Sequence, residues 1–287
     1  MPLDAPAAEP FRRIAAGRHE ILVGDCLDAM RAVPAASFDC AVTSPPYNLG
    51  IAYGSYGDRR PRADYLAWLA EVSAALARAL KPGGSLFLNL GGSGADPWLP
   101  MDAAAAFRGD FRLQNHIVWA KSVSVGGDTA GHFKPVNSPR YLNRCHEAVF
   151  HLTKTGAAPI DRLAVGVAYK DKGNVARFGA AGRPDRRCAG DVWFVPYETV
   201  RSRAQKFHHP SGFPVALAER CLRLHGGGPG ASVLDPFLGA GSTLVAAERL
   251  GWRGAGVELD TGYAETAAAR LAAEAGRTAP AAAGPGG

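Results

Sequence analysis

No stretch of about 18 apolar residues, the length that a helix needs to span a bilayer, occurs in the chain. The first 20 residues include Asp4 and Glu9 and lack an apolar core, so we expect no secretory signal peptide. The 35 glycines and 21 prolines follow no three-residue period, which excludes a collagen-like chain. These absences predict a protein without a membrane partner.

The five cysteines form no C-x-x-C pair. Because their number is odd and their positions are scattered, a disulfide scaffold and a zinc ribbon are both disfavoured. Cys145, His146 and His151 have a loose metal-like spacing, but no second pair of ligands accompanies them. We therefore expect no metal site, and we expect reduced thiols in the cytoplasm of a bacterial-type cell.

Acidic residues are scarce in the middle of the chain. Residues 112–210 hold 16 Lys and Arg against 7 Asp and Glu, a net charge of +9, whereas the other residues hold 16 against 19, a net charge of −3. Aromatic side chains are interspersed among these cations, as in segments that bind phosphate backbones and stack on bases. A solvated basic loop has the same composition, so charge alone leaves both interpretations open.

Hydrophobic residues make up 47% of the 287 residues and charged residues 20%, which is enough apolar material for a large core. Apolar periodicity and turn residues divide both ends of the chain into alternating strands and helices. This pattern is typical of an α/β fold with a mostly parallel, twisted sheet and helices on both faces, interrupted here by the basic middle. Predicted strands span residues 20–23, 38–43, 85–90, 115–119, 148–152, 232–234 and 254–257, predicted helices span residues 63–80, 211–224 and 243–250, and disordered tails are expected over residues 1–12 and 276–287.

A glycine-rich turn over residues 235–243, the glycine bend, joins a predicted strand to a predicted helix. Glycines there let a ligand approach the backbone closely. Glu258 lies 23 residues after Asp235, a spacing at which a carboxylate accepts both hydroxyls of a ribose, although Asp260 lies close enough to compete. No P-loop lysine follows, so an adenosine cofactor without phosphates fits best, with Asp235 facing its ammonium group. A glycine turn without a ligand is the alternative.

Ser44-Pro45-Pro46-Tyr47, the proline corner, directly follows the predicted strand over residues 38–43. Ligands of such sheets collect beyond the carboxyl ends of the strands. The Ser44 hydroxyl and the Pro45 carbonyl can accept the two N–H bonds of an exocyclic amino group, and the Tyr47 ring can stack on a planar base. A purely structural proline turn would contain the same residues. We expect the proline corner and the glycine bend to face each other across one cavity.

Both motifs resemble those of a known enzyme family. The proline corner resembles the catalytic motif, and the glycine bend the S-adenosylmethionine (SAM) motif, of amino-methyltransferases that act on DNA. The order, with the catalytic motif first, the basic segment second and the SAM motif last, is that of the β-class, or permuted, enzymes. The resemblance spans about residues 20–260 and implies a Rossmann-like SAM-methyltransferase fold with an inserted target-recognition region.

The resemblance also implies how the chain is organised. Residues 13–111 would form the catalytic half of the methyltransferase domain and residues 112–200 the target-recognition and DNA-binding region. Residues 201–275 would form the SAM-binding half, followed by the disordered tail over residues 276–287.

Individual site residues follow from the motif positions. The implied catalytic residues are Ser44, Pro45, Pro46 and Tyr47. The implied cofactor-binding residues are Asp25, Ser211, Asp235, Pro236, Phe237, Gly239, Gly241, Ser242, Thr243 and Glu258. Candidate phosphate contacts in the basic segment are Lys121, Lys134, Arg140 and Arg144. Asp25 and Asp235 have an alternative interpretation as turn or helix-cap carboxylates.

The resemblance implies site-specific transfer of the SAM methyl group to the exocyclic N4 amino group of a cytosine flipped out of double-stranded DNA. In this family a Ser at the position of Ser44 goes with cytosine N4 and an Asp with adenine N6, so adenine-N6 methylation is the alternative. An RNA methyltransferase and a non-catalytic DNA-binding module are further alternatives. The class also suggests a restriction-modification system, with a homodimer, a cognate restriction endonuclease and association with the nucleoid, none of which the sequence decides.

Overall fold

The structure is a computed structural model. It describes residues 10–51, 55–131, 136–171, 173, 185–197 and 212–278. Within them nine strands form one sheet in the order β1-β2-β11-β10-β3-β4-β8-β5-β9. These strands are β1 (Arg12–Ala16), β2 (His19–Val23), β3 (Phe38–Thr43), β4 (Leu80–Leu90), β5 (Arg112–Ala120), β8 (His146–Thr153), β9 (Val192–Phe194), β10 (Ser232–Asp235) and β11 (Arg253–Glu258). The helices are α1 (Cys26–Ala32), α2 (Arg62–Ala79), α3 (Leu99–Ala105), α5 (Val215–His225), α6 (Ser242–Arg249) and α7 (Thr261–Thr278).

Most neighbouring strands of the sheet run parallel. Five of its eight neighbouring pairs are parallel, and antiparallel pairing is confined to β1 with β2 and to β8 with β4 and β5. The predicted mostly parallel sheet is therefore confirmed. As a consequence, β2, β11, β10, β3 and β4 end at the same edge of the sheet, where ligands of α/β proteins collect.

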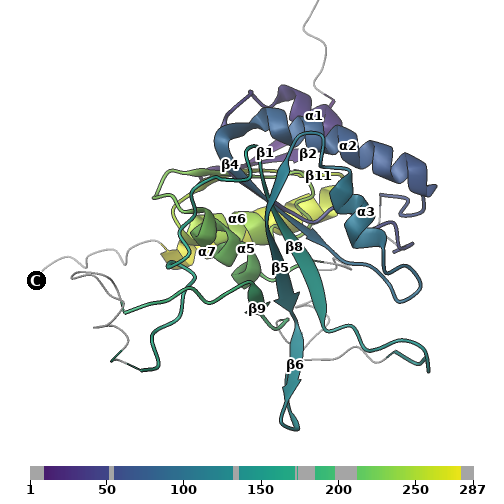
Figure 1. Ribbon diagram of the computed structural model, residues 1–287. Coiled ribbons are helices and arrows are strands. Elements are labelled where there is room, and N and C mark those ends of the chain that lie inside the picture. Colours follow the sequence, from purple (N-terminus) through teal and green to yellow (C-terminus); the bar gives the residue numbers. More distant parts are fainter. Residues whose placement is uncertain are drawn as a thin grey trace, which may run out of the picture.

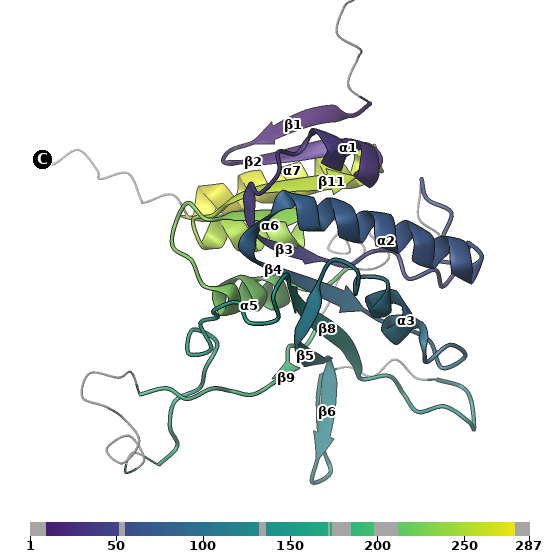
Figure 2. The same cartoon turned by 45° about the horizontal axis from the view of Figure 1, so that its top comes forward.

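Helices cover both faces of the sheet, as predicted (Figure 1, Figure 2). One core contains Cys40 and Val42 of β3 together with side chains of α5, α6 and α7, and the other contains Ala41 together with side chains of α1, α2 and α3. Successive side chains of β3 therefore point into opposite cores, as expected for a strand that is buried on both faces. A slip of one residue would exchange the two faces, so the paired cores fix the strand register.

Helix α2 shows how the sequence pattern produces the second layer. Its residues Tyr65, Leu69, Val72 and Leu76 are fully buried on one face, as the helical spacing predicts. The helix ends at Ala79, and the N–H of Leu80 donates to the Leu76 carbonyl at its C-cap. Leu80 is also the first residue of β4, so the chain passes from helix to strand without a loop.

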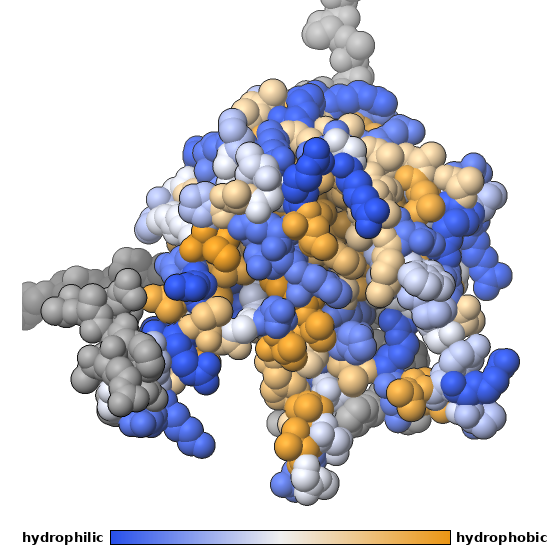
Figure 3. Space-filling view, in the orientation of Figure 1, coloured by the Kyte–Doolittle hydropathy of each residue, from blue (hydrophilic) through white to orange (hydrophobic). Residues whose placement is uncertain are grey.

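Three of the described strands of the basic middle belong to the same sheet as the rest of the chain. These strands, β5, β8 and β9, extend the sheet beyond β4, with β8 between β4 and β5. Between β5 and β8, strands β6 (Ser122–Val125) and β7 (Asp128–Gly131) form an antiparallel hairpin that projects from the sheet (Figure 1, Figure 2). Val123 and Val125 are exposed on this hairpin, which shows apolar surface along its length (Figure 3).

Several boundaries differ from the sequence prediction, among them the start of β4 at Leu80 instead of residue 85. Helix α5 begins at Val215 with Pro214 as its N-cap, so the predicted start at Ser211 is wrong. The residue before a proline is pushed to extended backbone, which prevents a helix from running through Phe213. At the chain ends, β1 begins at Arg12 inside the predicted tail, and α7 continues to Thr278. Residues 279–287 lie outside the described residues.

Candidate active site

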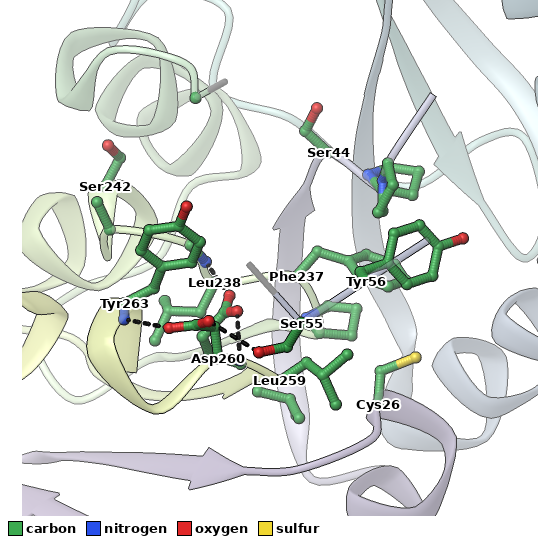
Figure 4. Close-up of a pocket in the computed structure, with 18 of the residues that line it drawn as sticks. Cys26, Ser44, Ser55, Tyr56, Phe237, Leu238, Ser242, Leu259, Asp260 and Tyr263 are labelled. Atoms are coloured by element: carbon green, nitrogen blue, oxygen red, sulfur yellow. Dashed lines mark hydrogen bonds between the residues drawn. The ribbon is translucent and has the colours of Figure 1, made fainter. Parts of the chain in front are cut away.

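One cavity of about 670 Å³ opens at the edge of the sheet where the parallel strands end. Gly24 and Asp25 follow β2, Ser44 and Pro45 follow β3, and residues 236–240 follow β10. Figure 4 shows Ser44 across this cavity from Leu259 and Asp260, at the end of β11. The proline corner and the glycine bend therefore line one cavity, as the sequence predicts.

Asp235 connects the glycine bend to the residue that precedes the proline corner, Thr43. Its Oδ1 accepts hydrogen bonds from Thr43 Oγ1 (2.7 Å) and from the backbone N–H of Phe237 (3.1 Å), and its Oδ2 accepts one from Thr243 Oγ1 (2.6 Å). The carboxyl is buried and does not line the cavity, and burial raises its pKa to about 6 despite these donors. Asp235 thus ties β3 to α6. Its predicted contact with an ammonium group stays a prediction.

The rest of the glycine bend divides into cavity-facing and packing residues. Pro236, Phe237, Gly239 and Ser242 line the cavity, as predicted. Gly241 does not line it. It has a φ of +85°, and a Cβ at this position would lie 2.8 Å from the Cβ of Ala267 in α7. Glycine is required there for the close approach of α7 and for the left-handed backbone.

Glu258 and Asp260 present carboxylates to the cavity. Glu258 Oε2 accepts from the N–H of Gly239 (2.7 Å), and Oε1 accepts from the N–H of Asp260 (2.9 Å). Burial raises the pKa of Glu258 above its usual value. Asp260 Oδ2 accepts from Ser55 Oγ at 2.8 Å (Figure 4). Both side chains line the cavity, so the ribose contact remains open between them.

Asp25 is a helix-cap carboxylate, and its predicted contact with the cofactor stays a prediction. Its side chain caps α1, where Oδ1 accepts hydrogen bonds from the N–H groups of Leu27 (2.8 Å) and Asp28 (3.2 Å). Asp25 also lines the cavity. Helix capping therefore fixes this carboxylate at the cavity wall.

Side chains outside the cavity hold the proline corner in place by hydrogen bonds. Ser44, Pro45 and Pro46 line the cavity, and the Pro46 carbonyl accepts a hydrogen bond from Tyr65 Oη (2.8 Å). Tyr47 is only 7% exposed and is absent from the cavity lining, and its hydroxyl lies 2.8 Å from Ser44 Oγ. Its predicted stacking on a base stays a prediction.

Aromatic residues outside the predicted motifs form much of the wall. The lining includes Tyr56, Trp68, Phe213 and Tyr197. The Trp68 ring packs edge-on against Phe237, with centroids 5.5 Å apart. Trp68 belongs to α2 and to none of the predicted motifs. Its place at the cavity depends on α2 packing beside the glycine bend, which local spacing does not reveal.

The four predicted phosphate contacts differ in exposure and in whether the structure describes them. Lys121 is 15% exposed and ion-paired with Glu147, and its ammonium lies 4.9 Å from the ring centroids of Trp119 and Tyr197. Lys121 is therefore largely buried and ion-paired, and its contact with a phosphate stays a prediction. Arg140 and Arg144 are exposed and stay candidates. Lys134, like the predicted cofactor residue Ser211, lies outside the described residues.

Two further kinds of feature are missing from the part of the chain that the structure describes. No group of three or more His, Cys, Asp or Glu in the described part of the chain is placed to hold a metal ion. No helix among the described residues is long and apolar enough to span a membrane.

Comparisons with known proteins agree on one family. A family model described as DNA methylase (N6_N4_Mtase) matches residues 38–269. The chain is 30% identical over 286 residues to the Type II methyltransferase M.BglII of Bacillus subtilis, covering 96% of this chain and 73% of the relative. It is 26% identical to the DNA adenine methyltransferase YhdJ of Escherichia coli (strain K12), covering 88% of this chain and 81% of the relative.

Solved structures show the same architecture. The PvuII DNA methyltransferase (cytosine-N4-specific) superposes with a TM-score of 0.67 at 18% identity, covering 92% of this chain and 93% of that chain. TTHA0409 from Thermus thermophilus, in complex with S-adenosyl-L-methionine, superposes with a TM-score of 0.56 at 27% identity, covering 90% and 93%. The first of these comparisons concerns the fold alone and supports the predicted Rossmann-like methyltransferase fold.

Proposed function

Because the chain belongs to the N6/N4 DNA methylase family, we propose that it methylates the exocyclic N4 amino group of cytosine in double-stranded DNA. The chain is a SAM-dependent DNA methyltransferase, and SAM is the cofactor of its family. The single observation that carries the finer proposal is Ser44, a neutral hydroxyl acceptor at the cavity wall, where the resemblance places Asp in adenine-N6 enzymes.

The residues of the cavity fit SAM. A volume of about 670 Å³ lies in the range of cofactor sites. Asp25, Glu258 and Asp260 offer acceptors for ribose hydroxyls and an adenine amino group, and aromatic rings supply apolar walls. The bound cofactor would supply an electrophilic methyl group that loses its neighbouring positive charge on transfer, so these apolar walls do not oppose the reaction.

The proline corner would act on the target amino group. The lone pair of such a nitrogen is delocalised into the ring, which makes it a weak nucleophile. Ser44 Oγ and the Pro45 carbonyl would accept its two N–H bonds and let the nitrogen pyramidalise toward the methyl group. These bonds strengthen as positive charge develops on the nitrogen, so they stabilise the transition state more than the ground state. Reaching this site requires the cytosine to leave the duplex.

Adenine N6 is the second candidate target. The E. coli relative is a DNA adenine methyltransferase, so similarity of sequence favours this reading as directly as Ser44 favours cytosine. The amino groups of adenine and cytosine have the same chemistry, and the same two acceptors would serve both.

Nucleoside analysis distinguishes the candidates. Purified protein is incubated with SAM and unmethylated duplex DNA, with RNA and free nucleosides as parallel substrates, and the digested products are identified by mass spectrometry. We expect N4-methylcytosine from duplex DNA. N6-methyladenine as the sole product would overturn the cytosine assignment, and methylated RNA with unmodified DNA would overturn the substrate class. Mapping methylated positions in a host genome would then give the recognition sequence.

A further inference from the structure

A cluster of buried polar side chains lies next to Ser44. It comes from the part of the sheet that includes β4 and β8, on the opposite side of β3 from β10 and the glycine bend. Glu147, near the start of β8, is 12% exposed and is ion-paired with Lys121, which follows β5 and is 15% exposed. Asn89, near the end of β4, is 4% exposed. Tyr47 lies between these groups and the catalytic hydroxyl. The proposed function assigns none of them a task beyond the predicted stacking of Tyr47.

The bonds of Tyr47 form a chain with one direction. Its hydroxyl carries one hydrogen and lies 3.1 Å from Glu147 Oε2, which as a carboxylate oxygen can only accept. The Asn89 backbone carbonyl is a second acceptor for this hydrogen, at a longer 3.4 Å. Tyr47 therefore donates to Glu147, the nearer and charged acceptor. The contact of 2.8 Å between Tyr47 Oη and Ser44 Oγ must then use the hydrogen of Ser44. With that hydrogen turned inward, Ser44 Oγ presents lone pairs to the cavity.

Asn89 supports the same direction. Its side-chain N–H groups point to Glu147 Oε2 at 2.8 Å and to Tyr47 Oη at 2.7 Å, with a longer contact to Ser44 Oγ at 3.4 Å. Tyr47 Oη thus accepts from Asn89 and Ser44 while it donates to Glu147, which uses its full bonding capacity. Because Ser44 receives only the longest of these contacts, its remaining acceptor capacity is free for a ligand.

The charges that maintain this direction are stable. Burial raises the pKa of Tyr47 well above its usual value, so the phenol keeps its proton. Burial alone would lower the pKa of Lys121, but the neighbouring Glu147 carboxylate and Tyr197 outweigh it and the net shift is upward. Lys121 therefore stays cationic beside Glu147.

We propose that Glu147, held by Lys121, is a positioning residue that turns the Ser44 hydroxyl inward, so that Ser44 can only accept a hydrogen bond from the target amino group. This inference rests on the proposed function, because an amino group offers donors and needs an acceptor. Glu147 acts through Tyr47 and touches neither base nor cofactor. The direction of the chain is the property under test.

Replacing Glu147 by Gln reverses the direction with minimal change in volume. Lys121 holds the amide oxygen, so the amide NH₂ faces Tyr47 and donates to it. Tyr47 then gives its hydrogen to Ser44, and the Ser44 hydrogen points into the cavity against the donors of the substrate. Asn89 and the new amide also oppose each other as donors. The matched control is Glu20→Gln, which neutralises the carboxylate of an exposed ion pair with Arg13 in β1 and β2, at the opposite end of the strand order from β8 and β5.

The first measurement compares the kinetics of these variants on duplex DNA. We expect Glu147→Gln to lower kcat at least about tenfold, because the lost interaction is made in the transition state. The Kd for SAM and the far-UV circular dichroism should match those of wild type. Glu20→Gln should retain wild-type kcat. A wild-type kcat in Glu147→Gln would overturn the inference, whereas an absence of methyl transfer by the wild-type protein would overturn the proposed function itself.

A second variant separates the directional role from a structural one. Tyr47→Phe removes the hydroxyl through which Glu147 acts on Ser44 and leaves only the long Asn89 contact of 3.4 Å among the described residues. Tyr47→Phe/Glu147→Gln should therefore lose no more kcat than Tyr47→Phe alone. Losses that multiply in the double variant would show that Glu147 acts independently of Tyr47 and would overturn the inference. The comparison of Tyr47→Phe with Tyr47→Phe/Glu147→Gln also tests the inference if Glu147→Gln alone reduces stability, because both proteins lack the Tyr47 hydroxyl.

Discussion

The two corners that face the cavity are built differently. The glycine bend contributes backbone, small residues and Phe237, and its one buried carboxyl, Asp235, bonds to neighbours within β3 and α6. The proline corner depends instead on side chains from four separate stretches of the chain, those around residues 44–47, 89, 121 and 147. The glycine bend therefore shapes the cavity mainly through its backbone. The proline corner instead sets which atoms donate and which accept hydrogen bonds, through its network of polar side chains.

The largest effect should come from the proline corner. Ser44→Ala removes an acceptor for the target amino group, and we expect kcat to fall by about 100-fold or more. The Kd for SAM should stay within about twofold of wild type, because no cofactor contact is assigned to this hydroxyl. Single-turnover kinetics and calorimetric titration measure the two quantities. Turnover at the wild-type rate would show that Ser44 has no catalytic role. It would also contradict the view that the proline corner acts through the hydrogen bonds of its side chains.

The next effect concerns the carboxyl that joins the corners. Asp235 has an ordinary pKa of 3.8 and a pKa of about 6 in the folded protein, so the folded state favours its protonated form. Its contribution to stability is therefore greatest below about pH 4 and is lost as pH rises to about 6, a change of about 2 to 3 kcal/mol. We expect the unfolding free energy of wild type minus that of Asp235→Asn to fall over this range in urea titrations. A difference independent of pH would refute the raised pKa.

A backbone position in the glycine bend should show a similar or smaller effect on stability alone. Gly241→Ala places a Cβ 2.8 Å from the Cβ of Ala267 and strains a φ of +85°. We expect the free energy of unfolding to fall by about 2 kcal/mol. Gly190 has a similar φ of +84° with nothing near its missing Cβ, so Gly190→Ala is the matched control for the strain alone. Equal losses in the two variants would show that the contact with α7 contributes nothing.

The smallest effect should separate the two candidate ribose ligands. Glu258→Ala is expected to weaken SAM binding by about tenfold, since hydrogen bonds to charged groups contribute about 1.5–3 kcal/mol and water replaces part of this. Asp260→Ala should weaken it less, because Asp260 already accepts from Ser55, Gly262 and Tyr263, whereas Glu258 accepts from two backbone N–H groups. Isothermal titration measures both Kd values. The reverse order would assign the ribose to Asp260.

The sequence predicts local elements well and contacts between distant ones poorly. The strand over residues 38–43 and the helix near 63–80 were predictable, because each buries side chains at its own period. The shared cavity was also predictable, since parallel strands end at one edge of the sheet. Nothing in the spacing of Lys121 indicates that Glu147 neutralises it, because this pairing depends on the antiparallel register of β5 and β8.

Short elements escaped prediction for a related reason. Helix α1 has seven residues, and its signal in the sequence is the cap by Asp25, a residue whose position also predicts a cofactor contact. Strand β1 has the sequence RRIAA and is stabilised by pairing with β2 instead of by its own apolar pattern. In both cases the tertiary context decides between alternatives that the residues leave open.

The central claim is that the proline corner and the glycine bend bring a target base and a methyl donor together in one cavity. The most direct measurement is a crystal structure with S-adenosylhomocysteine and a duplex that contains the mapped target. We predict the sulfur beside the glycine bend and the target base flipped out, with its amino nitrogen about 3 Å from Ser44 Oγ. A cofactor bound outside this cavity, or a flipped base that does not reach Ser44, would contradict the account.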